Sequence, residues 1–288
     1  MDYFYLVASV FLASSTSITN SLYNRKNKDK KGISAFFNLI LIISVFCSWL
    51  VLFLIDGTAD VSVLPYSVMF AVSYTLATVG LINALKTGSV MLSSLFSQLS
   101  LIVASIWGFF FWNEQFTWLS GIGLVLTVIA ICLCLINGKE EKKKLSLKWI
   151  FYVVMAFVGN AGCSIVQRTQ QIDCGGKHGN FFMLIAIGLS IAVFVVLYIR
   201  SDKSDSAELA RTSWYFPVAA GVLNAALNLF VIIMATSSLS ASLIYPTIAV
   251  GSLAVVTIFS LFVMKEKMRW WQWVGVALGA IATGILSV

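Results

Sequence analysis

GNFFMLIAIGLSIAVFVVLYI, residues 179–199, is the stretch that decides the fold class. It runs for 21 residues without a charged side chain. An α-helix rises about 1.5 Å per residue, so a run of this length crosses a hydrocarbon core of about 30 Å. The stretch therefore predicts one membrane-spanning helix.

Nine further apolar runs of similar length lie on both sides of it, separated by short breaks. They are residues 3–22, 33–55, 65–85, 88–112, 118–137, 147–170, 213–236, 240–263 and 270–287. The chain is 59% hydrophobic and only 11% charged, with a mean hydropathy of +0.93, whereas a soluble domain carries about a quarter charged residues. The runs lack the strict alternation of a transmembrane barrel. We expect an all-α integral membrane protein with ten transmembrane helices.

The basic residues predict the orientation of these helices. Of the 19 Lys and Arg residues, 17 lie in or beside the odd-numbered breaks, and only Arg168 and Lys177 belong to an even-numbered one. Basic loops stay on the cytoplasmic side. We therefore expect both termini outside the cytoplasm and a location in the plasma membrane. The net charge of +7 is explained by topology, so no nucleic-acid partner is expected.

The chain also contains an internal repeat at a shift of about 152 residues. The shift places Pro65 on Pro217, Glu114 on Glu266, Trp118 on Trp270 and Gly123 on Gly275. A looser match links residues 21–25 to residues 164–168, with Arg25 on Arg168. Because five is an odd number, a five-helix repeat must lie inverted in the membrane. We expect a first half at residues 1–138 and an inverted second half at residues 147–288.

Polar side chains cluster at mid-depth in equivalent segments of both halves, where an unpaired polar group is costly. The expected substrate-binding residues are Thr16, Asn20, Tyr74, Thr78, Ser94, Gln98, Trp107, Asn160, Ser164, Asn224, Asn228 and Tyr245. Pro246 frees a backbone carbonyl, which is tolerated where protein or a cavity satisfies it. The competing interpretation is that these residues only join neighbouring helices by hydrogen bonds.

The kind of solute follows from the chemistry of this set. Amides, hydroxyls and aromatic rings without a fixed charge favour a small polar or zwitterionic metabolite, such as an amino acid or a nucleobase-like compound. The alternative is an organic cation, since Tyr74, Trp107 and Tyr245 could surround a quaternary ammonium group. Either solute makes the chain a membrane transporter.

Enzymatic activity is not expected, because an enzyme needs an acid–base pair, metal ligands or an activated nucleophile. His178 is the only histidine, and the five cysteines are interpreted as packing residues, so no cofactor or metal is predicted. No carboxylate lies deep in an apolar run, which favours facilitated diffusion or exchange. Lys86 and Arg168 are interpreted as helix-end anchors whose long side chains reach the interface.

The helix count, the repeat and two local features together resemble the drug/metabolite transporter superfamily, in particular its ten-helix EamA-type branch. The local features are an acidic residue closing a helix, at Glu114 and Glu266, and glycines opening the next, at Gly121, Gly123 and Gly275. The resemblance covers essentially the whole chain. It implies a central cavity within the first four helices of each half, peripheral fifth and tenth helices, and alternating access. We expect a small-molecule substrate, the lipid bilayer as the surroundings, and a monomer or weak dimer.

Overall fold

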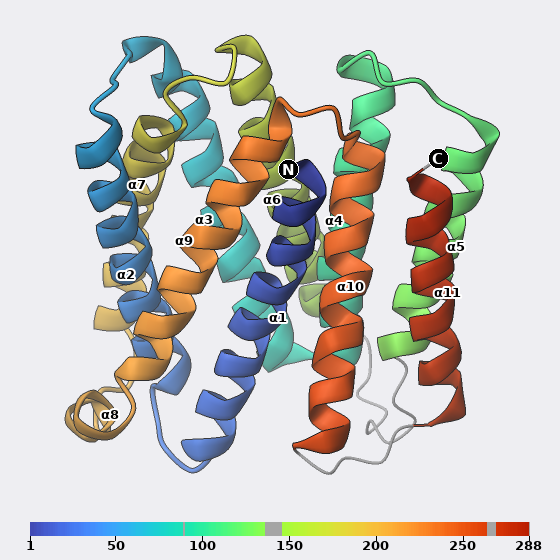
Figure 1. Ribbon diagram of the computed structural model, residues 1–288. Helices are drawn as coiled ribbons and strands as arrows, with labels where there is room; N and C mark the ends of the chain where they lie inside the picture. The colour runs from blue at the N-terminus through green and yellow to red at the C-terminus, as the bar shows by residue number, and fades with distance from the viewer. Residues whose placement is uncertain (89, 136–145, 264–268, 288) are drawn as a thin grey trace.

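The computed structural model describes residues 1–88, 90–135, 146–263 and 269–287, and these residues fold into α-helices joined by short connections (Figure 1). The helices are α1 (Asp2–Lys26), α2 (Ile33–Asp56), α3 (Leu64–Thr87), α4 (Val90–Phe111), α5 (Trp118–Leu135), α6 (Leu147–Asp173), α7 (Gly179–Ile199), α8 (Ser206–Thr212), α9 (Tyr215–Ala235), α10 (Ala241–Phe262) and α11 (Trp270–Leu286). A 3-10 turn, η1 (Val61–Val63), precedes α3. Each expected apolar run coincides with one long helix, while α8 was not expected.

Eight of the described helices are long and apolar enough to cross a membrane, namely α2 to α7, α9 and α10. The chain is therefore a multi-pass membrane protein. The two remaining long helices differ from these for different reasons. With 17 residues, α11 is apolar but short. By contrast, α1 has 25 residues but carries serine, threonine and asparagine side chains along residues 14–21.

The packing of the helices shows recurring pairs. The α3–α6 contact corresponds to the α9–α1 contact, and the α4–α6 contact corresponds to the α10–α1 contact. In the same way, the α2–α9 contact corresponds to the α7–α3 contact. The helices α5 and α11 pair with each other at one edge of the bundle (Figure 1). The first four long helices of each half therefore make up the rest of the bundle.

Two apolar clusters stabilise this arrangement. We call the first the α10 cluster, since α10 supplies more of its buried residues than any other helix, together with parts of α1, α4, α5, α9 and α11. We call the second the α7 cluster, formed by α7 with parts of α2, α3, α6 and α9. Between them the two clusters take in all ten long helices, and α9 contributes to both.

The closest helix crossing joins α3 and α6 through small residues. A Cβ atom added at Gly159 would lie 2.3 Å from the backbone nitrogen of Ala77, and one at Gly80 would lie 2.6 Å from that of Ala156. Backbone atoms of the two helices are thus in direct contact, which small residues permit in membrane proteins. This crossing fixes the relative positions of α3 and α6, and both helices contribute residues to a cavity wall.

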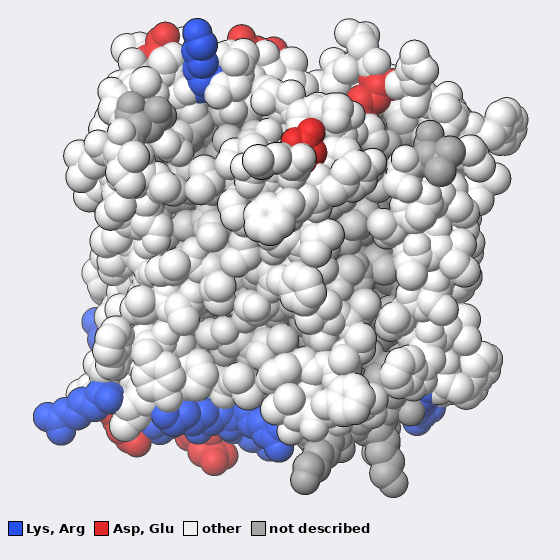
Figure 2. Space-filling model, viewed as in Figure 1, with Lys and Arg blue, Asp and Glu red and all other residues white. Residues whose placement is uncertain are grey.

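Charged side chains separate toward the two ends of the bundle. In Figure 2 Lys and Arg gather at the end where α8 lies, the opposite end is mainly acidic, and the band between them is uncharged. At the basic end, Lys30 pairs with Glu208 at 2.9 Å and Lys31 with Asp202 at 3.5 Å, tying the α1–α2 connection to the α8 region. Six other basic residues of the odd-numbered breaks and the expected helix-closing acid Glu266 lie outside the described residues. The six are Lys139, Lys142, Lys143, Lys144, Lys265 and Lys267.

Candidate functional site

A cavity of about 300 Å³ lies between the α7 and α10 clusters, near the middle of the helices that form it. We call it the central cavity. Apolar wall residues come from both clusters, for example Phe70 and Ile187 on one side and Ile248 on the other. The polar residues that line it are Thr16, Ser17, Tyr74, Gln98, Asn160, Ser164, Gln167, Asn224, Asn228, Tyr245 and Ser252. Among the described lining residues there is no Asp, Glu, Lys or Arg, so the wall carries no fixed charge.

A second cavity of about 450 Å³ continues the central cavity toward the basic end. We call it the vestibule. The two share Thr16, Ser17, Tyr74, Asn160 and Asn224 in their linings. The vestibule also reaches the exposed side chains of Asn24 and Lys86 near the ends of α1 and α3. The central cavity is therefore open at the basic end.

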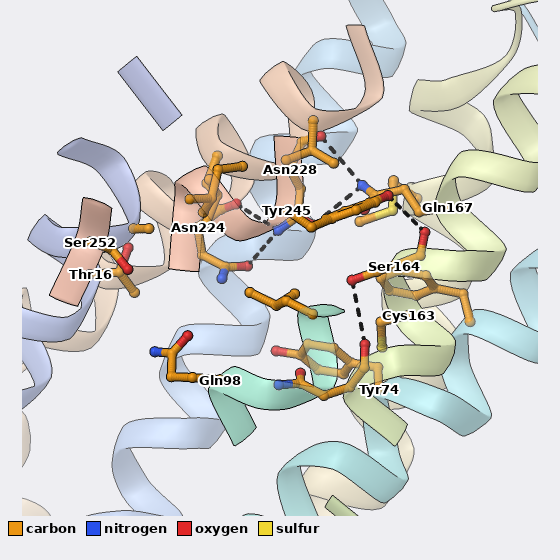
Figure 3. Close-up of a pocket in the computed structure, with 18 of the residues that line it drawn as sticks. Thr16, Tyr74, Gln98, Cys163, Ser164, Gln167, Asn224, Asn228, Tyr245 and Ser252 are labelled. Carbon is orange, nitrogen blue, oxygen red and sulfur yellow. Dashed lines mark hydrogen bonds between the residues drawn. The ribbon is translucent and has the colours of Figure 1, made fainter. Parts of the chain in front are cut away.

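Hydrogen bonds orient three of the amides in the central cavity, and Figure 3 shows those among Gln167, Asn228 and Asn224. The Asn160 Nδ2 atom of α6 donates to the carbonyl oxygen and the hydroxyl of Ser97 on α4, both at 3.1 Å. Gln167 Nε2 donates to the carbonyl and side-chain oxygens of Asn228, at 3.4 and 3.3 Å. Asn228 Nδ2 donates in turn to the carbonyl and side-chain oxygens of Asn224, at 2.8 and 3.2 Å. Part of each amide is thus used to join helices, as the competing interpretation of the sequence expects.

Other polar atoms of the wall remain available to a solute. Within the described part of the chain, the Gln98 amide and the Tyr74 hydroxyl have no hydrogen-bond partner, and Figure 3 shows both on the same side of the cavity. The side-chain atoms Asn160 Oδ1 and Asn224 Nδ2 also have no hydrogen-bond partner among those residues. The wall therefore offers donors and acceptors together, which suits a solute that carries both.

A buried ion pair lies at the end of the bundle opposite the vestibule. Arg168 Nη2 on α6 lies 2.8 Å from Glu114 Oε1, and the two side chains are 7% and 10% exposed. The Trp112 ring lies over the guanidinium, with 5.2 Å between the Arg168 Cζ atom and the ring centroid. The interpretation of Arg168 as an anchor reaching the interface is therefore wrong, because the Glu114 carboxylate holds it inside the bundle.

The structure divides the expected site residues into three groups. Those lining the central cavity are Thr16, Tyr74, Gln98, Asn160, Ser164, Asn224, Asn228 and Tyr245. Asn20 and Thr78 line the vestibule. Ser94 and Trp107 line neither cavity, and Trp107 stacks on Phe111 toward the end of α4, with ring centroids 4.0 Å apart.

The structure adds Ser17, Gln167 and Ser252 to the cavity wall, although the expected set did not contain them. The sequence does contain a signal for Gln167 as a cavity residue, because Gln167 follows Asn160 and Ser164 at the spacing that places residues on one helix face. Among the described residues, no group of three or more His, Cys, Asp or Glu side chains could hold a metal ion.

Comparison with known proteins extends the description of the fold. No family model matches the chain, and no curated protein matches it. A solved structure described only as "Crystal structure of protein" superposes on 99% of this chain and 95% of its own, with a TM-score of 0.73 at 14% sequence identity. At this identity the likeness shows a shared fold over essentially the whole chain and carries no information on the substrate.

Proposed function

We propose that this protein is a transporter of the EamA-type branch of the drug/metabolite transporter superfamily, and that it moves a small polar or zwitterionic metabolite across the plasma membrane. One observation carries the proposal. A multi-pass bundle encloses an uncharged cavity with polar side chains at mid-length, which continues into the vestibule at one end and has a buried ion pair beyond its other end. A binding site between two unequal ends is what alternating access requires.

The arrangement of the helices supports the remaining parts of this proposal. Ten crossings with both termini outside the cytoplasm put the basic end in the cytoplasm, in agreement with the positive-inside rule. The recurring packing pairs are those that two inverted halves would produce. In this orientation the vestibule opens to the cytoplasm, and the described conformation faces inward.

The size and chemistry of the central cavity favour a solute such as an amino acid or a nucleobase-like compound. A volume of about 300 Å³ corresponds to roughly ten water molecules at about 30 Å³ each. A solute with a net charge would lose its hydration there without meeting a counter-ion, which is costly. A solute without net charge can exchange its water for the free amide and hydroxyl groups of the wall.

An organic cation is the second candidate, and the rings of Tyr74 and Tyr245 on the cavity wall favour it. Each ring could contribute about 0.5–2 kcal/mol to binding a quaternary ammonium group. Trp107, the third ring expected for such a cage, lies outside both cavities. For this reason we prefer the solute without net charge.

The purified protein in detergent should show a raised melting temperature with one class of solute in a screen of amino acids, nucleobases and quaternary amines. A ligand at 100 times its dissociation constant stabilises a protein by about 2.7 kcal/mol. The solute that is found should then enter proteoliposomes, and an imposed potassium diffusion potential should leave its equilibrium distribution unchanged. Protein-free vesicles are the control.

Two results would contradict the preferred candidate. Accumulation that follows the imposed potential would favour the organic cation. A protein that is stabilised by none of these solutes and moves none of them would speak against transport of either class.

A further inference from the structure

We propose that Glu114 and Arg168 form the outer gate of this protein, an ion pair that closes the central cavity at the end opposite the vestibule by binding the start of α10 and that releases α10 when the cavity opens there. The inference rests on the proposed transport function, since only a carrier needs its two ends to open in turn. It identifies the contact that holds the described conformation closed on the outside.

The ion pair joins three segments at one point. Besides the contact with Glu114, Arg168 Nη2 donates to the carbonyl oxygen of Leu239 at 3.2 Å. The backbone N–H of Ala241, at the start of α10, donates to the same Glu114 oxygen at 2.7 Å. Trp112 adds a hydrogen bond from its indole N–H to the Thr169 hydroxyl at 3.2 Å. The connection after α4 is thereby fastened to both α6 and α10.

The helices α6 and α10 also contribute residues to the wall of the central cavity, about one helical turn closer to the middle of the bundle. Tyr245 on α10 lines the central cavity and donates from its hydroxyl to the carbonyl oxygen of Ser164 on α6 at 3.1 Å. Arg168 follows Ser164 by four residues, and Ala241 precedes Tyr245 by four residues. Four residues of helix correspond to about 6 Å along the axis. The ion pair therefore forms the next layer behind the Tyr245–Ser164 contact, toward the outer end.

The two charged partners belong to different halves of the chain. Glu114 lies in residues 1–138, whereas Arg168 and Ala241 lie in residues 147–288. However, α6, which carries Arg168, packs on α3 and α4, whereas α10 packs on α1. When these two groups of helices move apart, the ion pair loses its bonds to Leu239 and Ala241. Those two bonds are where such a movement must be resisted or released.

The pair is also incompletely satisfied, which suits a contact that opens and closes. Glu114 Oε2 and the Nε and Nη1 atoms of Arg168 are buried without a hydrogen-bond partner in the described part of the chain. Desolvation offsets much of the attraction in a buried ion pair, and unpaired polar atoms offset more of it. The net stabilisation of the closed gate by the pair is therefore smaller than the attraction between the two charges alone would give.

Cys163 provides a reporter for the gate, because it lines the central cavity. The other four cysteines are replaced by alanine, at Cys47, Cys132, Cys134 and Cys174. A membrane-impermeant thiosulfonate reagent is then added either to intact bacterial cells, where it meets the outer end, or to inside-out vesicles, where it meets the vestibule. In this parent, Cys163 should react from the vestibule side and be protected from the outer side.

The gate variants are Glu114→Gln and the double variant Glu114→Gln with Arg168→Gln. The double variant removes both charges, so it leaves no unpaired buried charge that could prevent folding. We expect the rate of Cys163 modification from the outer side to rise at least about tenfold in both. Glu208→Gln is the matched control, because it breaks the Lys30–Glu208 ion pair at the opposite end. It should leave the outer rate at the parent value.

An outer rate that stays at the parent value in both gate variants would overturn the gate. So would an equal rise from both sides, or the same rise in Glu208→Gln, since either would indicate general loosening. The labelling needs no solute, so failure of the gate and failure to find a transported solute are separate results.

Discussion

The Gln98→Ala variant should bind the transported solute roughly 5- to 150-fold more weakly than the parent, while its melting temperature without solute stays the same. In the described part of the chain, the Gln98 amide lines the central cavity and has no hydrogen-bond partner. Its donor and acceptor therefore serve the solute alone. Removing them leaves a buried solute group unpaired, at a cost of about 1–3 kcal/mol.

Affinity is measured by calorimetry or by the KM of uptake into proteoliposomes. Gln272→Ala is a suitable control, because Gln272 on α11 lines neither cavity and donates instead to the carbonyl oxygen of Cys134 at 3.2 Å. The control should lose stability and keep its affinity. Equal affinity losses in the two variants would show that Gln98 does not contact the solute.

The Gly159→Ala variant should lose about 1–3 kcal/mol of unfolding free energy, the cost typical of overpacking a close contact. The added Cβ would lie 2.3 Å from the backbone nitrogen of Ala77 and 2.6 Å from the carbonyl oxygen of Ser73. Backbone atoms cannot rotate away as a flexible side chain can. The axes of α3 and α6 must therefore separate, and because Tyr74 and Asn160 lie on these helices, solute binding should weaken as well.

Gly284→Ala is the matched control for this substitution. Gly284 also lies in a helix, α11, but a Cβ added there meets no atom within 4 Å. Alanine is favoured over glycine inside a helix by about 0.5–1 kcal/mol, so this variant should be as stable as the parent or slightly more stable. Thermal unfolding in detergent compares the two. A stable Gly159→Ala protein would mean that the crossing is looser than described.

Much of the fold could be predicted because hydropathy and helix length are local properties of the sequence. The run at residues 179–199 has no charge and the length of one crossing, and α7 spans those residues. The short helix α8 could not be predicted in this way, because its local sequence has neither the length nor the hydropathy of a crossing. It has seven residues, and its stability comes from burial of Leu209 against other segments rather than from its own pattern.

Much less of the site could be derived, since it depends on how each helix is rotated and on which helices meet. Gln98 and Trp107 are both on α4 and both looked suitable, but only Gln98 faces the cavity. The contact between Glu114 and Arg168 joins residues 54 positions apart in sequence. Nothing in the local sequence around Arg168 distinguishes a buried partner from a surface anchor.

The polar character of α1 has a consequence for the biosynthesis of this protein. Of the helices described, α1 is translated before the others, is among the least apolar, and packs against α9 and α10. Translation of α9 begins at Tyr215, 189 residues after α1 ends at Lys26. At about 5–20 residues per second, α1 waits roughly 10–40 s for its partners. During that interval its serine, threonine and asparagine side chains depend on the insertion machinery or on membrane water, so α1 is among the last of these helices to reach its final surroundings.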